Sequence, residues 1–288
     1  MKKQYDAAII GGDKRQVYLT EFLKNEDISV VSYGIPTSFK ESCGEMISLE
    51  EICKQSRVIL APIPMSRDKK HLTCENNSIL IDDFLNLLDS EHTLIGGSLT
   101  SETKIHCIKN NIPYFDLMDS HSVTTLNAVA TAEGAIAKAI SESSGNLDHS
   151  KGLILGFGRC GKILAKKLQS FGVHVYICAR SKEALTEGYA FGYEILQMDD
   201  LATKIKDFEY IFNTIPALVL TDEILDSVST ELTIIDIASA PGGLNYESAK
   251  SQKLNAHLYS GIPGKIAPKA SAKILADEMI PIIKGGKE

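Results

Sequence analysis

The feature that most constrains the fold is a run of glycines set between two apolar segments. The apolar residues 153–155 lead into Gly156, and a helical pattern of apolar residues follows Gly161. A strand, a tight turn and a helix are the context in which the spacing GxGxxG indicates a dinucleotide site. Gly156 permits the turn, Gly158 leaves room for a pyrophosphate against bare backbone, and Gly161 lets the helix approach the strand. The sequence therefore predicts a Rossmann-type domain that binds phosphates at a helix N-terminus.

The end of the second strand of this domain distinguishes NADP from NAD. An NAD site usually carries Asp or Glu about 20 residues after the glycines, whereas an NADP site carries an Arg. Here the strand ends with Arg180, Ser181 and Lys182, and the first carboxylate is Glu183, inside the next helix. A guanidinium, a hydroxyl and an ammonium suit a ribose 2′-phosphate. We expect NADP; the alternative is a solvated Arg180 beside an NAD site.

Further cofactor contacts are expected in the loops after later strands, because parallel sheets bind ligands beyond the carboxyl ends of their strands. These loops are residues 213–216 and 236–243. The complete set of expected cofactor contacts is Gly156, Phe157, Gly158, Arg159, Cys160, Gly161, Arg180, Ser181, Lys182, Thr214, Ile215, Pro216, Ala238 and Ser239.

Strand and helix patterns alternate along the whole chain. They predict an α/β protein of two doubly wound parallel-sheet domains, the second a Rossmann-type dinucleotide-binding domain, linked by long helices. Strands are expected at 6–10, 28–33, 57–61, 92–95, 112–115, 153–157, 173–179, 209–213, 232–237 and 256–259. The expected parts are a substrate-side domain (1–121), an inter-domain helix and link (122–146), an NADP-binding domain (147–265) and a C-terminal helix packing back on the first domain (266–288). The catalytic cleft is expected between the two sheets.

Composition excludes several classes of protein. With 44% hydrophobic and 23% charged residues the chain is globular, and its net charge of −7 argues against a nucleic-acid binder. No apolar run approaches the length of a membrane span, and the first residues lack the apolar core of a signal peptide, so a cytoplasmic location is expected. The cysteines form no CxxC pair, which favours free thiols and no metal site. They are Cys43, Cys53, Cys74, Cys107, Cys160 and Cys178.

The loops that follow the first domain's strands are candidates for substrate binding. Gly12 and Asp13 belong to a Gly-Gly turn that opens a helix but lacks GxGxxG, so we assign the turn to an anionic group of the substrate. Arg15 would be the forked partner of a carboxylate; a solvated Arg15 is an equal alternative. Pro64 and Ser98 follow two further strands and complete this group.

Several strings taken together resemble the family of dipicolinate synthase A subunits. They are residues 11–16, 131–134, the glycine turn with 179–181, 213–216, 236–243 and 261–269. The resemblance covers nearly the whole chain in order. Two positions depart from the family pattern: Ala240 stands where a basic residue is frequent, and Lys265 where an apolar residue occurs.

The resemblance implies NADP-linked oxidation of dihydrodipicolinate to pyridine-2,6-dicarboxylate during spore formation, in the mother cell. It also implies a partner, a flavoprotein-like B subunit, and it adds Thr131 to the substrate contacts. Aromatisation removes a hydride, which NADP accepts, and a proton, which a base or water accepts. Candidates for catalysis are Glu133, His121 and Lys265. The alternative for each is a structural residue or a solvated surface residue, which single residues of these types usually are.

Two other functions remain open at this point. A 2-hydroxyacid dehydrogenase shares the two-domain plan, but it needs an Arg and a His from the loops after late strands, and residues 236–264 contain no Arg. A non-catalytic nucleotide-binding protein of the same complex is the second alternative, because no acid/base pair stands out in the sequence. The sequence also leaves open whether the chain forms a homo-oligomer.

Overall fold

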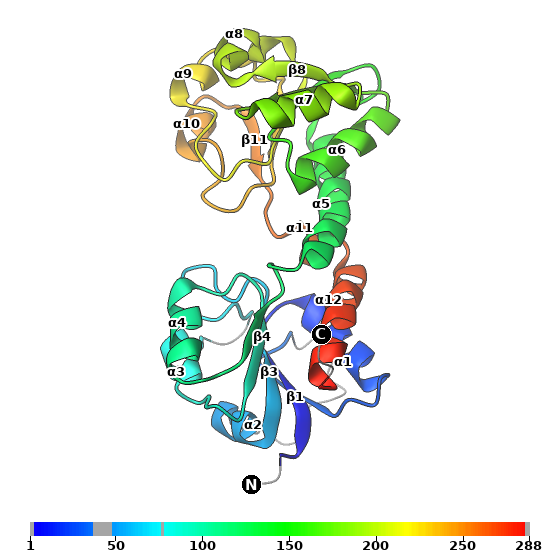
Figure 1. Cartoon of the computed structure of the whole chain (residues 1–288). Helices are drawn as coiled ribbons and strands as arrows, with labels where there is room; N and C mark the ends of the chain where they lie inside the picture. Colours follow the sequence, from blue (N-terminus) through cyan, green and yellow to red (C-terminus); the bar gives the residue numbers. More distant parts are fainter. Residues whose placement is uncertain (1–2, 37–47, 76–77, 286–288) are drawn as a thin grey trace. The chain divides into compact units, whose positions relative to one another are not determined.

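The computed structural model describes residues 3–36, 48–75 and 78–285 (Figure 1). The chain divides into two compact units, one formed by Met1–Thr124 with Ala267–Glu288 and the other by Thr125–Ile266. Cys43, one of the expected free thiols, lies outside the described residues.

The first unit is a five-stranded parallel sheet in the order β2-β1-β3-β4-β5. Its strands are β1 (Tyr5–Ile10), β2 (Val30–Tyr33), β3 (Ser56–Leu60), β4 (Thr93–Gly96) and β5 (Tyr114–Asp116), and its helices are α1 (Lys14–Lys24), α2 (Leu49–Gln55), α3 (Ile81–Leu85), α4 (Ser101–Lys109) and α12 (Pro268–Ile283).

Alternate side chains of these strands supply two separate cores. Ala8 and Ile10 of β1 pack with residues of α2, α3 and α4, whereas Ala7 and Ile9 pack with residues of α1 and α12. Successive residues of a strand point to opposite faces of a sheet, and both faces here are covered by helices, so the buried residues 7–10 of β1 are all apolar.

The second unit is a six-stranded parallel sheet in the order β11-β10-β9-β6-β7-β8, which is the Rossmann order. Its strands are β6 (Lys151–Leu155), β7 (His174–Ala179), β8 (Glu194–Gln197), β9 (Tyr210–Asn213), β10 (Thr233–Asp236) and β11 (Asn255–Leu258). Its helices are α5 (His121–Glu142), which begins in the first unit, α6 (Arg159–Ser170), α7 (Lys182–Ala190), α8 (Leu201–Lys204), α9 (Asp222–Leu225), α10 (Tyr246–Ser251) and α11 (Ile262–Ile266), with short 3-10 turns at Met198–Asp200 and Ile205–Asp207.

The long helix α5 is part of this unit's core rather than a free-standing link. Its small residues Ala132, Ala135 and Ala139 are fully buried and pack with Ile154 of β6 and Leu164 of α6. Among the described strands, β8 is the one that the sequence pattern missed. It lies at the sheet edge and buries only Leu196, so its residues show no apolar run.

Candidate functional site

The three glycines of the turn between β6 and α6 have three different surroundings. Gly156 has φ +93°, a conformation that favours glycine. A Cβ at Gly161 would collide with the carbonyl oxygen of Gly156, so the helix could not approach the strand with any larger residue. A Cβ at Gly158, by contrast, would meet no heavy atom of the described residues within 4 Å.

Gly158 is also the N-cap of α6, and it has no side chain with which to satisfy the first N–H groups of the helix. Open space therefore lies beside unsatisfied donors at the positive end of a helix dipole. This cradle fits the pyrophosphate of a dinucleotide, as the glycine pattern predicts.

The three residues between these glycines differ in how much of each is accessible to a ligand. The Phe157 ring is buried and packs edge-on against Tyr193, with centroids 5.9 Å apart, so only its backbone remains for a ligand. Burial raises the pKa of the Cys160 thiol, which therefore stays protonated. Arg159 is exposed at the start of α6.

Exposed cationic side chains follow β7. Arg180 and Lys182 are exposed, and within the described part of the chain neither forms an ion pair. Ser181 is the N-cap of α7, because its Oγ accepts a hydrogen bond of 3.1 Å from the Ala184 N–H. The hydroxyl hydrogen of Ser181 and both cations are thus available to an anion at this strand end.

A buried carboxylate, Asp236, ties together the two loops expected near the nicotinamide. Its Oδ1 accepts hydrogen bonds from Asn213 Nδ2 (2.9 Å) and from the Ala238 N–H (3.0 Å). Its Oδ2 accepts from the Gly243 N–H (2.6 Å) and from the Tyr246 hydroxyl (2.8 Å). Burial, followed by the hydrogen bond to this carboxylate, raises the pKa of Tyr246. Asp236 therefore fixes the loops after β9 and β10.

Asp236 and Asn213 were not among the expected contacts. The signal available in the sequence was a polar residue at the end of each of two apolar runs, and the structure makes the two residues partners in register. Thr214 donates a hydrogen bond of 2.9 Å to the Leu155 carbonyl and so fixes its loop to β6. The remaining expected contacts differ in exposure: Ile215 is half-buried, Pro216 and Ser239 are exposed, and Ala238 is buried.

In the first unit, the side chain of Arg15 has a partner within the chain, which disfavours the expected contact with a substrate carboxylate. The side chain is 8% exposed and bonded to Asp13, with Nε at 2.9 Å from Oδ1 and Nη2 at 2.8 Å from Oδ2. Nη2 also donates to the carbonyl oxygen of Ile63. The fork that was expected to hold a substrate carboxylate is thus filled by a carboxylate of the chain itself.

Asp13 and Gln16 also bind N–H groups at the N-terminus of α1, which was expected to bind an anionic group of the substrate. Asp13 accepts from the Arg15 N–H, and Gln16 Oε1 accepts from the Asp13 N–H at 2.8 Å, which is a complete capping box. Burial raises the pKa of Asp13, but the hydrogen bonds and charge of Arg15, with a smaller effect of Arg67, outweigh it and lower the pKa overall.

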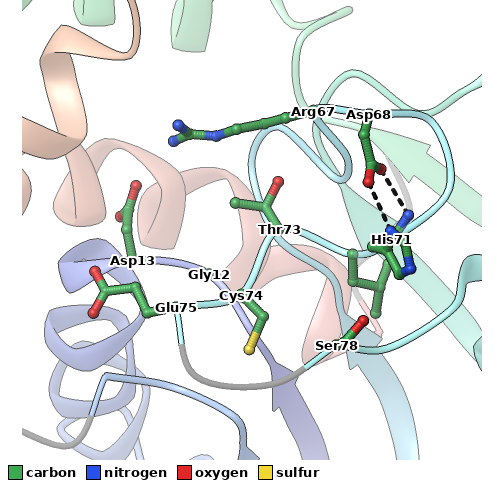
Figure 2. A pocket seen from close by; sticks show the side chains of 10 residues that line it. Gly12, Asp13, Arg67, Asp68, His71, Thr73, Cys74, Glu75 and Ser78 are labelled. Carbon is green, nitrogen blue, oxygen red and sulfur yellow. Dashed lines mark hydrogen bonds and ion pairs between the residues drawn. The ribbon is translucent and has the colours of Figure 1, made fainter.

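A cavity of about 450 Å³ lies beside this cap. It is lined by Gly12 and Asp13, which follow β1, and by residues of the segment that follows β3: Arg67, Asp68, His71, Leu72, Thr73, Cys74, Glu75 and Ser78 (Figure 2). The order of the first sheet reverses between β1 and β3, and ligands of doubly wound sheets bind at such a point. Sequence reasoning missed Arg67 and His71, because their loop follows a strand by several residues and contains no glycine.

Other expected substrate contacts lie outside the lining of this cavity. Ser98 has φ +55°, and its N–H donates 2.9 Å to Asp116, which also binds neighbouring N–H groups of the loop. Pro64 is half-buried after a cis peptide bond. Thr131 belongs to the second unit, and its hydroxyl donates 3.0 Å to the Asn127 carbonyl.

The three catalytic candidates occupy separate surroundings. Glu133 is exposed and forms an ion pair of 2.9 Å with Lys167. Lys265 donates 2.7 Å to the Ser260 carbonyl, and its Nζ lies 5.0 Å from the centroid of the Tyr259 ring. His121 is exposed at the first position of α5 and belongs to the first unit.

The described residues contain no group of three metal-ligating side chains, and among them no helix is long and apolar enough to cross a membrane. The five described cysteines are free thiols.

Comparison with known proteins identifies relatives for both halves of the chain. A family model for the N-terminal domain of the dipicolinate synthase A subunit matches residues 6–118, and one for the NAD binding domain of D-isomer specific 2-hydroxyacid dehydrogenases matches residues 122–233. The A subunit of dipicolinate synthase from Bacillus subtilis (strain 168) is 26% identical over 275 residues, which are 94% of this chain and 93% of that protein. The chain resembles the dipicolinate synthase A subunit throughout.

Solved structures confirm the expected fold. The crystal structure of the dipicolinate synthase A subunit from Bacillus halodurans superposes with a TM-score of 0.82 at 26% identity, over 96% of this chain and 97% of that one. A 2-hydroxyacid dehydrogenase from Ketogulonicigenium vulgare Y25, at 16% identity and a TM-score of 0.59, shares the fold over 100% of this chain and 97% of its own. The second unit is thus a dehydrogenase-type NAD-binding domain, and the cofactor is a nicotinamide dinucleotide.

Proposed function

We propose that the chain is the NADP-binding A subunit of a dipicolinate synthase, which oxidises dihydrodipicolinate to pyridine-2,6-dicarboxylate. The observation that supports this most is the open phosphate cradle at Gly158, in a chain that resembles the dipicolinate synthase A subunit over 94% of its length. The proposal includes a partner, the B subunit, and a place in the cytoplasm of a sporulating mother cell, as the name of the relative and the family resemblance suggest.

The choice of NADP rests on the end of β7. Arg180 and Lys182 are exposed there, and Glu183, in the first turn of α7, is the first carboxylate of the sequence after that strand. A 2′-phosphate gains charge-assisted hydrogen bonds from such cations, whereas a 2′-hydroxyl needs a carboxylate acceptor.

NADP supplies the acceptor of a hydride when it is bound. The chain's own residues bind the phosphates, hold the loops after β9 and β10 through Asp236, and receive a proton. Glu133 forms an ion pair with Lys167, and Lys265 donates a hydrogen bond to a carbonyl oxygen. Of the three candidates we retain His121 for the proton, because an imidazole ring has one nitrogen that can accept a proton and another that can donate one.

A non-catalytic nucleotide-binding role in the complex remains the second candidate. The ion pair of Glu133 and the carbonyl bond of Lys265 favour it, because they leave the second unit without a ready acid or base among these candidates. A 2-hydroxyacid dehydrogenase is disfavoured, since residues 236–264 contain no Arg.

The decisive experiment mixes the purified chain with NADP and freshly generated dihydrodipicolinate, with and without the B subunit, and follows NADPH by absorbance. NADPH formation that needs this chain, and that falls when NAD replaces NADP, is the expected result. NADPH formation that requires the B subunit but is unchanged by His121→Asn supports the non-catalytic role. No turnover in either mixture contradicts the proposed reaction.

A further inference from the structure

Arg67 is the cation of the first unit's cavity that has hydrogen-bonding capacity left. It is exposed, and its guanidinium extends across the cavity on the side of Asp13, away from Asp68 (Figure 2). Within the described residues the guanidinium makes no hydrogen bond and no ion pair, whereas the fork of Arg15 is filled by Asp13. A guanidinium with unused donors in a concave site is suited to a carboxylate, which it can bind in a bidentate manner.

The loop that carries Arg67 is held in place before any ligand binds. It is a closed hairpin in which the Thr73 N–H donates 2.8 Å to the Met65 carbonyl. Inside the hairpin, Asp68 accepts from the N–H of His71 at 2.8 Å and lies 2.6 Å from His71 Nδ1. A preordered loop loses little conformational entropy when a ligand binds. A larger part of the interaction free energy at Arg67 therefore contributes to the affinity.

Hydroxyl groups of two further residues lie at the cavity. Thr73 Oγ1 is buried and has no hydrogen-bond partner among the described residues. A buried hydroxyl without a partner is unfavourable, and a ligand oxygen that reaches it after a small displacement removes this cost. Ser78 is exposed at the lining and adds a second hydroxyl.

The acidic residues of the cavity use other partners than the Arg67 guanidinium for their hydrogen bonds. Asp13 is paired with Arg15, and Asp68 accepts hydrogen bonds from backbone N–H groups and contacts His71. Glu75 is exposed and carries the one carboxylate of the lining for which no described partner is present. It opposes an anion, but its carboxylate is exposed, so dissolved salt screens the repulsion.

We propose that this cavity binds a carboxylate group of the substrate, with Arg67 as its forked partner and the Thr73 and Ser78 hydroxyls beside it. The inference rests on the proposed function for the identity of the substrate, a small ring dicarboxylate. The capacity for a carboxylate follows from the cavity itself.

The experiment is a calorimetric titration of the full chain with pyridine-2,6-dicarboxylate, the product of the proposed reaction, at low ionic strength. Arg67→Ala should weaken binding by a factor of about 10 to 100, the usual effect of losing a charge-assisted bidentate contact. Lys70→Ala is the matched control, because it removes one exposed positive charge from the same hairpin but not from the cavity lining. It should change affinity less than about threefold. Glu75→Gln should strengthen binding, and NADP affinity should stay constant in every variant.

A second ligand and a kinetic assay separate this inference from the proposed function. If the chain binds glutarate in an Arg67-dependent manner but not pyridine-2,6-dicarboxylate, the carboxylate site stands and the assigned substrate is wrong. If the chain oxidises dihydrodipicolinate and Arg67→Ala leaves KM unchanged, the function stands and the inference is overturned. Equal losses in Arg67→Ala and Lys70→Ala, or no binding of either ligand, overturn it as well.

Discussion

Each of the two sheets places a glycine turn and a helix after its first strand, yet only one of the two helices is open to a ligand. In the second unit the N-cap of α6 is Gly158, which leaves the first N–H groups without a side-chain cap. In the first unit the N-cap of α1 is Asp13, whose carboxylate accepts a hydrogen bond from the first turn, while the Gln16 side chain accepts one from the Asp13 N–H. The helix dipole is the same in both, so the difference lies in which group occupies its positive end.

The comparison explains why a Gly-Gly turn before a helix is not by itself an anion site. A Cβ at Gly12 would collide with the side chain of Gln16, whereas one at Gly158 would meet open space among the described residues. Gly12 is thus needed by the protein's own capping box, whereas Gly158 leaves open space at the N-terminus of α6. The closed cap therefore disfavours the α1 terminus as the site of an anionic substrate group, and Arg67 is our proposal for that site.

The largest expected effect tests this contrast directly. Gly158→Val places a branched side chain where the phosphates should lie, so NADP affinity should fall by more than about 100-fold while the melting temperature stays near that of the parent. Gly12→Val should do the opposite. Its φ of +98° and the collision with Gln16 should lower the free energy of unfolding by about 2 to 4 kcal/mol, with NADP affinity unchanged in the folded fraction.

Isothermal titration with NADP and thermal melting of both variants measure the two effects. If Gly158→Val retains NADP affinity, the nucleotide binds away from the glycine turn. If Gly12→Val melts like the parent, the capping box does not depend on that glycine.

A smaller effect is expected at the end of β7. Arg180→Ala should weaken NADP binding by about 2 kcal/mol and leave NAD binding nearly unchanged, because only NADP carries the phosphate that the guanidinium would bind. Lys166→Ala on α6 is a control, since it removes an exposed charge of the same sign from the same unit. Calorimetric titration with both nucleotides measures the difference, and equal losses for NADP and NAD would refute the assignment of Arg180.

The sequence predicted the fold well because the fold depends on features that are local in the chain. Buried parallel strands appear as apolar runs, as in β1 and β6, and the C-terminal helix expected within 266–288 is α12, Pro268–Ile283. The edge strand β8 has a single buried residue and was missed for that reason.

Parts of the candidate site were predictable from the sequence only where all of their residues lie in one turn. The glycine turn between β6 and α6 is such a part. The role of Arg15 was not predictable from the sequence. Its guanidinium binds the carboxylate of Asp13, two residues away, and the carbonyl of Ile63, 48 residues further along the chain. The role of Asp236 likewise depends on hydrogen bonds to residues distant in the sequence, Asn213 and Tyr246.

Tyr246→Phe tests whether the hydrogen bonds of Asp236 stabilise the loops after β9 and β10. The change removes one of the hydrogen bonds to the buried Asp236 carboxylate, and the free energy of unfolding should fall by about 1 to 2 kcal/mol. Tyr189→Phe is the control, because Tyr189 is 72% exposed on α7, and it should change the free energy of unfolding by less than about 0.5 kcal/mol. Urea unfolding curves measure both values. Equal values for the two variants would mean that the Tyr246 hydroxyl is not needed to hold the carboxylate.

The smallest expected effect concerns the closed cap of the first unit and its dependence on pH. Arg15 keeps the pKa of Asp13 below its ordinary value despite burial. A carboxyl group with a lower pKa in the folded than in the unfolded state adds stability that is present above the unfolded pKa, about 3.9, and is lost as the pH falls through the folded pKa. Arg15→Lys keeps the charge but loses the fork, so it should cost about 1 kcal/mol at pH 7. It should cost less at pH 3, because below the unfolded pKa part of the stability that the ionised pair contributes is already lost.

Urea unfolding at the two pH values measures this difference, and a double-mutant cycle with Asp13→Asn isolates the coupling between the two side chains. The NADP affinity of Arg15→Lys should be unchanged at pH 7, because the cap and the phosphate cradle belong to different units. An equal cost at both pH values would show that Arg15 stabilises α1 by packing rather than through the carboxylate of Asp13. A loss of substrate affinity in Arg15→Lys without any loss of stability would return Arg15 to the substrate site and leave Arg67 without its role.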